Sequence, residues 1–182
     1  MLYGGLFSIS GFAMPHMFDA TIAPLKRALT NLSHILKKGE AHADAKKIEH
    51  AVLLNGRLYP DMYPLMRQVQ IATDMSKGAA ARLASLEVPK YEDNETSFEE
   101  LQARIAKTIA FIETVTPAQL KGSASRDITI TVRKTDLHFN GEAYLLNWVM
   151  PNVYFHVVTA YNILRHNGVE LGKPDFLGKL KT

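Results

Sequence analysis

The sequence predicts an all-α protein, a four-helix bundle with a short extra helix and a small β-hairpin before the last helix. Four long segments carry apolar residues at steps of three and four, which is the pattern of amphipathic helices. One short segment alternates β-branched residues with period two. No repeat or long linker divides the 182 residues, a length typical of one domain. We therefore expect a single bundle with a long crossover between its third and fourth helices.

The first helix is predicted from His16 to Lys38. Pro24 falls inside this segment, where it is expected to kink the helix or mark its first turn, because proline costs ~3 kcal/mol in a helix interior. Gly39 favours an end to the helix, since glycine can adopt the positive φ of a C-terminal cap. A short helix is expected over Ala43–Leu54. The apolar face of the first helix consists of Phe18, Ile22, Leu25, Leu29, Leu32 and Leu36.

The second long helix is predicted from Met62 to Leu86. Asp61 is a suitable N-cap because its carboxylate can accept from free backbone N–H groups. Pro64 then falls in the first turn, where its missing N–H group has no partner to lose. The following segment, EVPKYEDNET, has a proline, clustered acids and no periodicity, so it is expected to form a loop.

The third helix is expected to begin after Ser97. Ser97 and Glu100 fit a capping box, in which each side chain binds the backbone N–H group of the other residue, and Thr96 with Glu99 is an alternative register. The helix should end near Val115, because Pro117 disfavours helical backbone at the residue before it.

The hairpin is predicted from strands Asp127–Val132 and Asp136–Phe139, with a turn at Asn140-Gly141. The last helix follows from Glu142 to His166 and is apolar on most sides, so it should be buried. Pro151 is expected to bend it. The remaining residues contain Gly172, Pro174 and Gly178 and are expected to be irregular.

Composition excludes several kinds of chemistry and partner. The chain has no cysteine, which excludes disulfides, thiolate metal ligands and cysteine nucleophiles. There are 21 Lys and Arg against 18 Asp and Glu, and no basic run is longer than two residues. We therefore expect no nucleic-acid partner.

The N-terminal segment does not have the form of a signal peptide or a membrane anchor. Its first basic side chain is Lys26, and its apolar stretch is short and rich in glycine. The expectation is a cytoplasmic protein without a membrane partner. Residues 1–16 are interpreted as an N-terminal overhang and residues 17–182 as the domain.

Two long segments resemble a known family. These are RLYPDMYPLMRQVQIATDMSKGAAARL (Arg57–Leu83) and MPNVYFHVVTAYNILRHNGVELGKPDFLG (Met150–Gly178), and the loop YEDNETSFEEL between them is also similar. They resemble an uncharacterised bacterial family within the DinB/YfiT-like superfamily of helical bundles. The resemblance implies a DinB-like bundle fold for residues 17–182 and assigns no activity.

The same resemblance raises the question of a metal. Members of the wider superfamily typically carry three metal-binding histidines, one on the second helix and an H-x-x-x-H pair on the last. Here Asn152 and His156 stand at the paired positions, and the second helix has no histidine. A third ligand would have to be Asp61, Gln68 or His50. A divalent metal with His156 as its one retained histidine ligand is therefore an alternative rather than an expectation.

The residues themselves predict a polar line on a buried helix. Asn152, His156 and Thr159 are four and three residues apart, so they share one side of the last helix. Asp61 and Gln68 are seven apart and are expected to line the second helix. One hypothesis is a small polar pocket at the bundle centre for a small-molecule ligand, with catalytic residues unassigned. The alternative is a structural core network, because buried polar groups need partners.

Self-association is the other functional hypothesis. The last helix is apolar nearly all round, and aromatic side chains along it are of the kind that anchor interfaces. The sequence thus favours a homodimer, and a non-catalytic self-associating bundle is the alternative to a ligand pocket. The aromatic residues in question are Tyr144, Trp148, Tyr154 and Tyr161.

Overall fold

The computed structural model describes residues 16–179, so the expectation for residues 1–15 lies outside the described part of the chain. Helices predominate, with one two-stranded antiparallel sheet. The elements are α1 (Met17–Lys46), α2 (His50–Leu54), α3 (Leu65–Leu83), α4 (Phe98–Glu113), β1 (Asp127–Val132), β2 (Thr135–Asn140), α5 (Gly141–Ala143), α6 (Met150–His166) and α7 (Lys173–Leu177).

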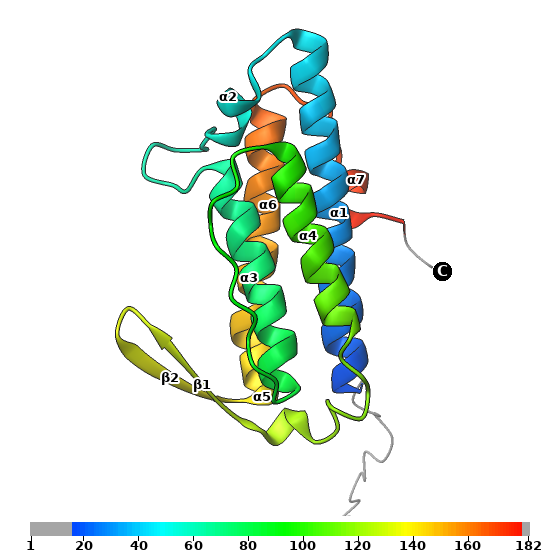
Figure 1. Ribbon diagram of the computed structural model, residues 1–182, viewed down its shortest axis with the longest axis vertical. Helices are drawn as coiled ribbons and strands as arrows, with labels where there is room; N and C mark the ends of the chain where they lie inside the picture. The colour runs from blue at the N-terminus through cyan, green and yellow to red at the C-terminus, as the bar shows by residue number, and fades with distance from the viewer. Residues whose placement is uncertain (1–15, 180–182) are drawn as a thin grey trace, which may run out of the picture.

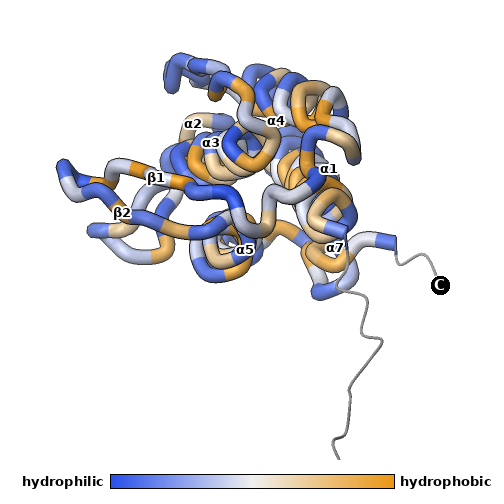
Figure 2. Tube along the Cα trace, turned by 90° about the horizontal axis from the view of Figure 1, so that it is seen from below, coloured by the Kyte–Doolittle hydropathy of each residue, from blue (hydrophilic) through white to orange (hydrophobic). Residues whose placement is uncertain are grey.

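The four long helices, α1, α3, α4 and α6, lie side by side (Figure 1). The helix α3 packs against α6 and α4, and α1 packs against the same two helices. Seen along their axes, the helices surround a common centre, and the hairpin projects to one side (Figure 2). Fully buried apolar side chains from every long helix meet there, including Leu25, Leu32, Leu65, Val69, Leu101, Val153 and Leu164.

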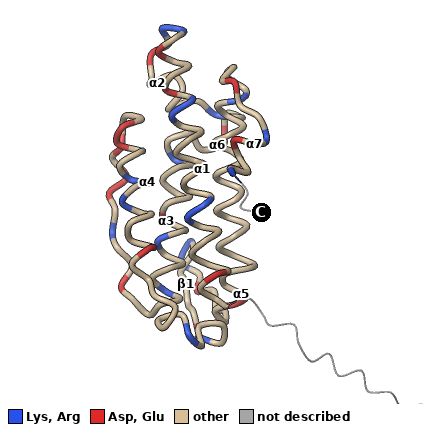
Figure 3. The backbone as a smooth tube through the Cα atoms, turned by 90° about the vertical axis from the view of Figure 1, so that its right-hand side faces the viewer, with Lys and Arg blue, Asp and Glu red and all other residues tan. Residues whose placement is uncertain are grey.

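Charged residues of both signs are scattered over the helices, as Figure 3 shows for one side of the molecule. This distribution agrees with the small net charge of +3. Within residues 16–179, none of the helices combines the length and the apolar character that crossing a bilayer would require.

The helix α1 is longer than the sequence pattern indicates. It continues through Gly39 to Lys46 and ends where Lys47 adopts a positive φ of 56°. Gly39 is buried against α6, and a Cβ atom on it would lie 2.9 Å from Leu164 Cδ2. The glycine therefore permits close packing of α1 on α6 rather than ending the helix. The expected short helix over 43–54 is reduced to α2, His50–Leu54.

The helix α3 begins three residues later than predicted. Its N-cap is Pro64, whose backbone is extended, and the predicted capping role of Asp61 is wrong. Asp61 is exposed in the turn that precedes α3. The helix ends at Leu83 rather than Leu86, and Ser85 has a positive φ of 57°.

The elements specified by local signals are confirmed. Ser97 and Glu100 form the predicted capping box at the start of α4. The strands pair from Asp127 opposite Asn140 to Val132 opposite Thr135. The two connecting residues, Arg133 and Lys134, have φ values of 49° and 69°. Two successive positive φ angles are typical of the tight turn that matches strand twist in a hairpin.

The last helix begins with a cap and a local change of helical pitch. Asn140 closes β2 and its side-chain oxygen accepts from Ala143 N at 2.8 Å, so it is an N-cap rather than a free turn. Helical structure then runs from α5 into α6 through a π-helical segment, Tyr144–Val149. Pro151, where the sequence predicts a bend, is the second residue of α6. The predicted irregular tail instead contains the short helix α7.

We predict that Gly141→Ala destabilises the protein by at least ~2 kcal/mol. A Cβ atom at Gly141 would lie 1.9 Å from the Ser123 carbonyl oxygen, a backbone atom that can move only with its segment. Chemical denaturation measures the change. Gly172→Ala is the control, because its Cβ would meet only Pro174 Cδ at 3.4 Å. Equal stability of the two variants would contradict the close approach of α5 to residues 123–125.

Candidate functional site

A hydrogen-bonded histidine joins α3 to α6. His156 Nδ1 and Gln68 Oε1 are 2.7 Å apart, and both residues are buried. Gln68 Nε2 donates to the Tyr63 carbonyl oxygen at 2.8 Å, which fixes the orientation of the amide. Since Gln68 Oε1 can only accept, His156 Nδ1 must carry the proton. His156 Nε2 is left with a free lone pair.

The free nitrogen of His156 reaches solvent. His156 is 8% exposed. Its Nε2 atom has no hydrogen-bond partner among residues 16–179. This atom is not fully buried. Burial, together with the positive charge of Arg67, lowers the pKa of His156 from 6.5 to about 4. At neutral pH the side chain is therefore an uncharged hydrogen-bond acceptor.

The other predicted site residues do not join this pair. Asn152 Nδ2 donates to the Trp148 carbonyl oxygen at 2.6 Å, and Thr159 Oγ1 donates to the Phe155 carbonyl oxygen at 2.7 Å. Both side chains thus bind the backbone of their own helix. Asp61 lies before the start of α3, so the predicted line from Asp61 to Gln68 along one helix does not exist. Of the five predicted residues, Gln68 and His156 are brought together.

The donor atoms around His156 do not match a divalent metal centre. Among residues 16–179 there is no cluster of three His, Asp or Glu side chains that could hold an ion. Gln68 Oε1 already accepts from His156 Nδ1, and Asn152 faces its own backbone. A zinc site needs three or four converging ligands, and this site offers one imidazole nitrogen. The residues present therefore do not fit the metal of the wider superfamily.

A buried arginine on α4 was not predicted. The Arg104 side chain is 2% exposed and uses all three of its nitrogen atoms. Its guanidinium group donates to Thr73 Oγ1 (2.7 Å), Asp74 Oδ1 (2.7 Å), the Glu92 carbonyl (2.9 Å) and Glu95 Oε1 (2.9 Å), and lies 3.0 Å from Asp93 Oδ1. Thr73 and Asp74 belong to α3, and the three other partners belong to the loop before α4. The guanidinium group therefore ties this loop to α3.

This arginine network extends to His156. Asp93 also pairs with Arg67, and Arg67 Nη1 donates to Gln70 Oε1 at 3.1 Å. Gln70 Nε2 in turn donates to Glu95 Oε2 at 2.9 Å. Arg67 is the charge that acts on the His156 pKa. One sequence signal could have revealed the network: Arg104 falls at a buried step of the apolar pattern of α4, after a loop rich in acids.

Three cavities lie elsewhere on the molecule. One of about 910 Å³ lies along α1 beside α7. One of about 430 Å³ is lined by the loop around Tyr91 and by α4, and one of about 490 Å³ lies at the junction of α1 and α2. His156 is not among the residues that line these three cavities. The His156–Gln68 pair thus lies between α3 and α6, apart from these three cavities.

We predict that His156 makes stability depend on pH. Below pH 6.5 the unfolded chain takes up a proton that folded His156 does not accept until about pH 4. Proton uptake therefore favours unfolding, and the free energy of unfolding falls by on the order of 2 kcal/mol between these pH values. Denaturation of the protein and of His156→Phe at both pH values isolates this contribution. The same pH dependence in both proteins would contradict a neutral, buried histidine.

Comparisons with known proteins agree with the fold. Residues 17–177 match the model of a family described as a domain of unknown function, DUF1993. The chain is similar to a crystal structure of a DinB family member protein from Shewanella denitrificans, with 40% sequence identity and a TM-score of 0.86. The match covers 91% of this chain and 94% of that one. No curated protein gives a significant match. The chain therefore belongs to the DUF1993 family of DinB-like proteins.

Proposed function

We propose that this protein is a DinB-like four-helix bundle that binds a small molecule through the open Nε2 atom of His156. One observation carries the proposal, namely the chain of hydrogen bonds from the Tyr63 carbonyl through Gln68 to His156 Nδ1. These hydrogen bonds fix the tautomer of His156 and leave the lone pair of its Nε2 atom directed outward. The ligand is expected to donate an O–H or N–H hydrogen bond to this nitrogen.

The lowered pKa favours binding over acid–base catalysis. A general base works best when its pKa lies near the working pH. The pKa of His156 is lowered to about 4, so at neutral pH the imidazole is a weak base that can still accept a hydrogen bond. The nearby Arg67 charge disfavours a cationic ligand. We therefore expect a neutral or anionic donor, such as an alcohol, a phenol or an amide.

The His156–Gln68 pair also has a structural part to play. It links α3 to α6 inside the core and specifies how the two helices align. Removing either partner leaves a buried polar group unpaired, at a cost of about 1–3 kcal/mol. The alternative proposal, a purely structural network, predicts this loss of stability and no binding.

We predict that phenol shifts the NMR signals of the His156 ring in a saturable way, whereas anisole does not. Both molecules have the same ring, but anisole lacks the hydroxyl donor. Phenol should also shift the backbone amide signals around residue 156, and His156→Phe should lose this second response while the fold is retained. His138→Phe, which replaces an exposed histidine of the hairpin, should keep it. Absence of a phenol response, or an equal response to anisole, would favour the purely structural network.

Self-association is a second candidate, supported by exposed apolar side chains near and on α6. Phe155 is 56% exposed, Leu146 53% and Val158 36%. Phe155 and Val158 are three residues apart and so share one face of the helix. Exposed apolar side chains grouped on one surface are typical of interfaces between proteins. We propose a homodimer in which this face of α6 contacts its equivalent.

We predict that light scattering on an eluting sample shows a dimer for the native chain and a monomer for Phe155→Glu. A buried, unpaired carboxylate would oppose association at the centre of an apolar contact. Val52→Glu is the matched control, because Val52 is 58% exposed on α2 and lies outside the proposed interface. A native chain that stays monomeric at high concentration would contradict the homodimer.

A further inference from the structure

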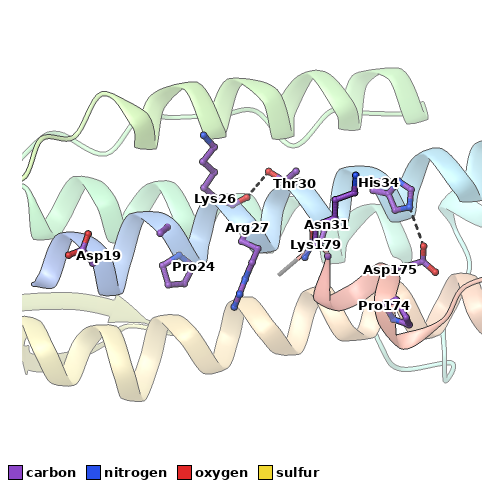
Figure 4. Close-up of a pocket in the computed structure, with 12 residues that line it drawn as sticks. Asp19, Pro24, Lys26, Arg27, Thr30, Asn31, His34, Pro174, Asp175 and Lys179 are labelled. Carbon is purple, nitrogen blue, oxygen red and sulfur yellow. Dashed lines mark hydrogen bonds and ion pairs between the residues drawn. The ribbon is translucent and has the colours of Figure 1, made fainter. Parts of the chain in front are cut away.

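The cavity of about 910 Å³ beside α1 is a long groove with a fixed wall at one end. Its floor is one face of α1 between Asp19 and His34, a distance of about 22 Å along the helix axis. Its wall is the segment around α7 (Figure 4). The groove and the His156 site share no residue, so this inference does not depend on the proposed function.

The wall is held to α1 by polar contacts. Asn31 Nδ2 donates to the Phe176 carbonyl oxygen at 2.9 Å. Asp175 accepts from Lys38 at 3.1 Å, and it lies 3.1 Å from His34 Nε2. These contacts fix the position of α7 relative to α1. The groove is therefore a formed feature with one closed end.

Cations in the groove differ in whether they have partners. Lys26 pairs with Glu113 on α4, and His34 is occupied by Asp175. Arg27 and Lys179 have neither a hydrogen-bond nor an ion-pair partner among residues 16–179. Figure 4 shows Lys26 directed toward α4, whereas Arg27 is directed to the other side of α1. Among residues 16–179, two positive charges beside the wall thus have no partner.

Between Arg27 and the open end, the floor carries Ala23 and Pro24 and then the carboxylate of Asp19. Ala23 lies one turn before Arg27, and Pro24 beside it has no N–H group to offer. Asp19 stands one further turn away, at the open end. From Arg27 to Asp19 the floor is about 12 Å long. Positive charge at the wall and a carboxylate at the opening would orient an elongated anion with its head inward.

We propose that this groove binds an alkyl carboxylate. The carboxylate would accept charge-assisted hydrogen bonds from Arg27 and Lys179. The alkyl chain would lie along Ala23 and Pro24 toward the open end, where burial of its apolar surface stabilises the complex. Asp19 disfavours the reverse orientation through like-charge repulsion.

Titration of the full chain with decanoate, followed by amide NMR, tests the proposal. Saturable shifts should appear along residues 19–34 and 173–178. Acetate, which has the head group without the chain, and decyltrimethylammonium, which has the chain with the opposite charge, should not produce them. Equal responses to the cationic probe, or shifts elsewhere in the protein, would overturn the proposal.

Two variants with matched controls test separately the contacts with the carboxylate and the contacts with the alkyl chain. Arg27→Gln combined with Lys179→Gln should weaken decanoate binding about tenfold or more. Lys37→Gln combined with Lys121→Gln removes the same net charge and should not. Ala23→Glu should abolish binding by placing a carboxylate in the tail path, whereas Ala110→Glu on α4 should have no effect. Unchanged decanoate affinity in the Arg27→Gln, Lys179→Gln double variant or in Ala23→Glu would overturn the proposed site.

The apolar residues 1–15 are an alternative occupant of the groove. Replacing Leu2, Leu6 and Phe7 with serine in the full chain tests this alternative. Decanoate binding that is equal in the native chain and in this variant supports the proposal. Binding by the variant alone would assign the groove to the N-terminal segment and overturn it.

Discussion

A buried guanidinium group determines how the long connection between α3 and α4 is placed. Arg104 lies on the core side of α4, and a buried charge that is left unpaired is strongly destabilising. Its partners come from α3 and from the acidic loop that precedes α4. The loop must therefore follow α3 closely enough for Asp93 and Glu95 to reach it. The clustered acids, from which the sequence predicts only a loop, are therefore also an internal requirement of the fold.

The same network sets the electrostatic environment of His156. Asp93, held by Arg104, also pairs with Arg67, whose charge acts together with burial on the His156 pKa. A buried histidine is tolerated when it is neutral and hydrogen-bonded, and Gln68 supplies the bond. The helix α3 contributes to both requirements of burial, because Thr73 and Asp74 join the loop acids around Arg104 and Gln68 binds His156.

Local signals in the sequence were sufficient where the cause of a structure is local. The capping box at Ser97 and the alternation before the hairpin depend on residues a few positions apart, and both are confirmed. The end of α1 could not be predicted, because the reason for a glycine at position 39 is its close packing against Leu164, which is 125 positions away. Spacing alone placed Gln68 and His156 on suitable helices, but it could not show that Asn152 and Thr159 bind their own backbone. Arg104 was missed because its spacing alone does not show that it is buried and paired. Its partners on α3 and in the loop before α4 are known only from the structure.

The hydrogen bond between His156 and Gln68 also explains why the ligand pattern of the wider superfamily has a different meaning here. Three imidazoles can converge on an ion because each presents a lone pair. At His156 the inward nitrogen carries a proton that is committed to an amide oxygen, so only the outward nitrogen remains. The Gln68 amide thus decides the tautomer of His156 and the direction of its remaining lone pair. His156 is therefore a single, oriented acceptor, and its chemistry follows from its neighbour Gln68 as much as from the imidazole itself.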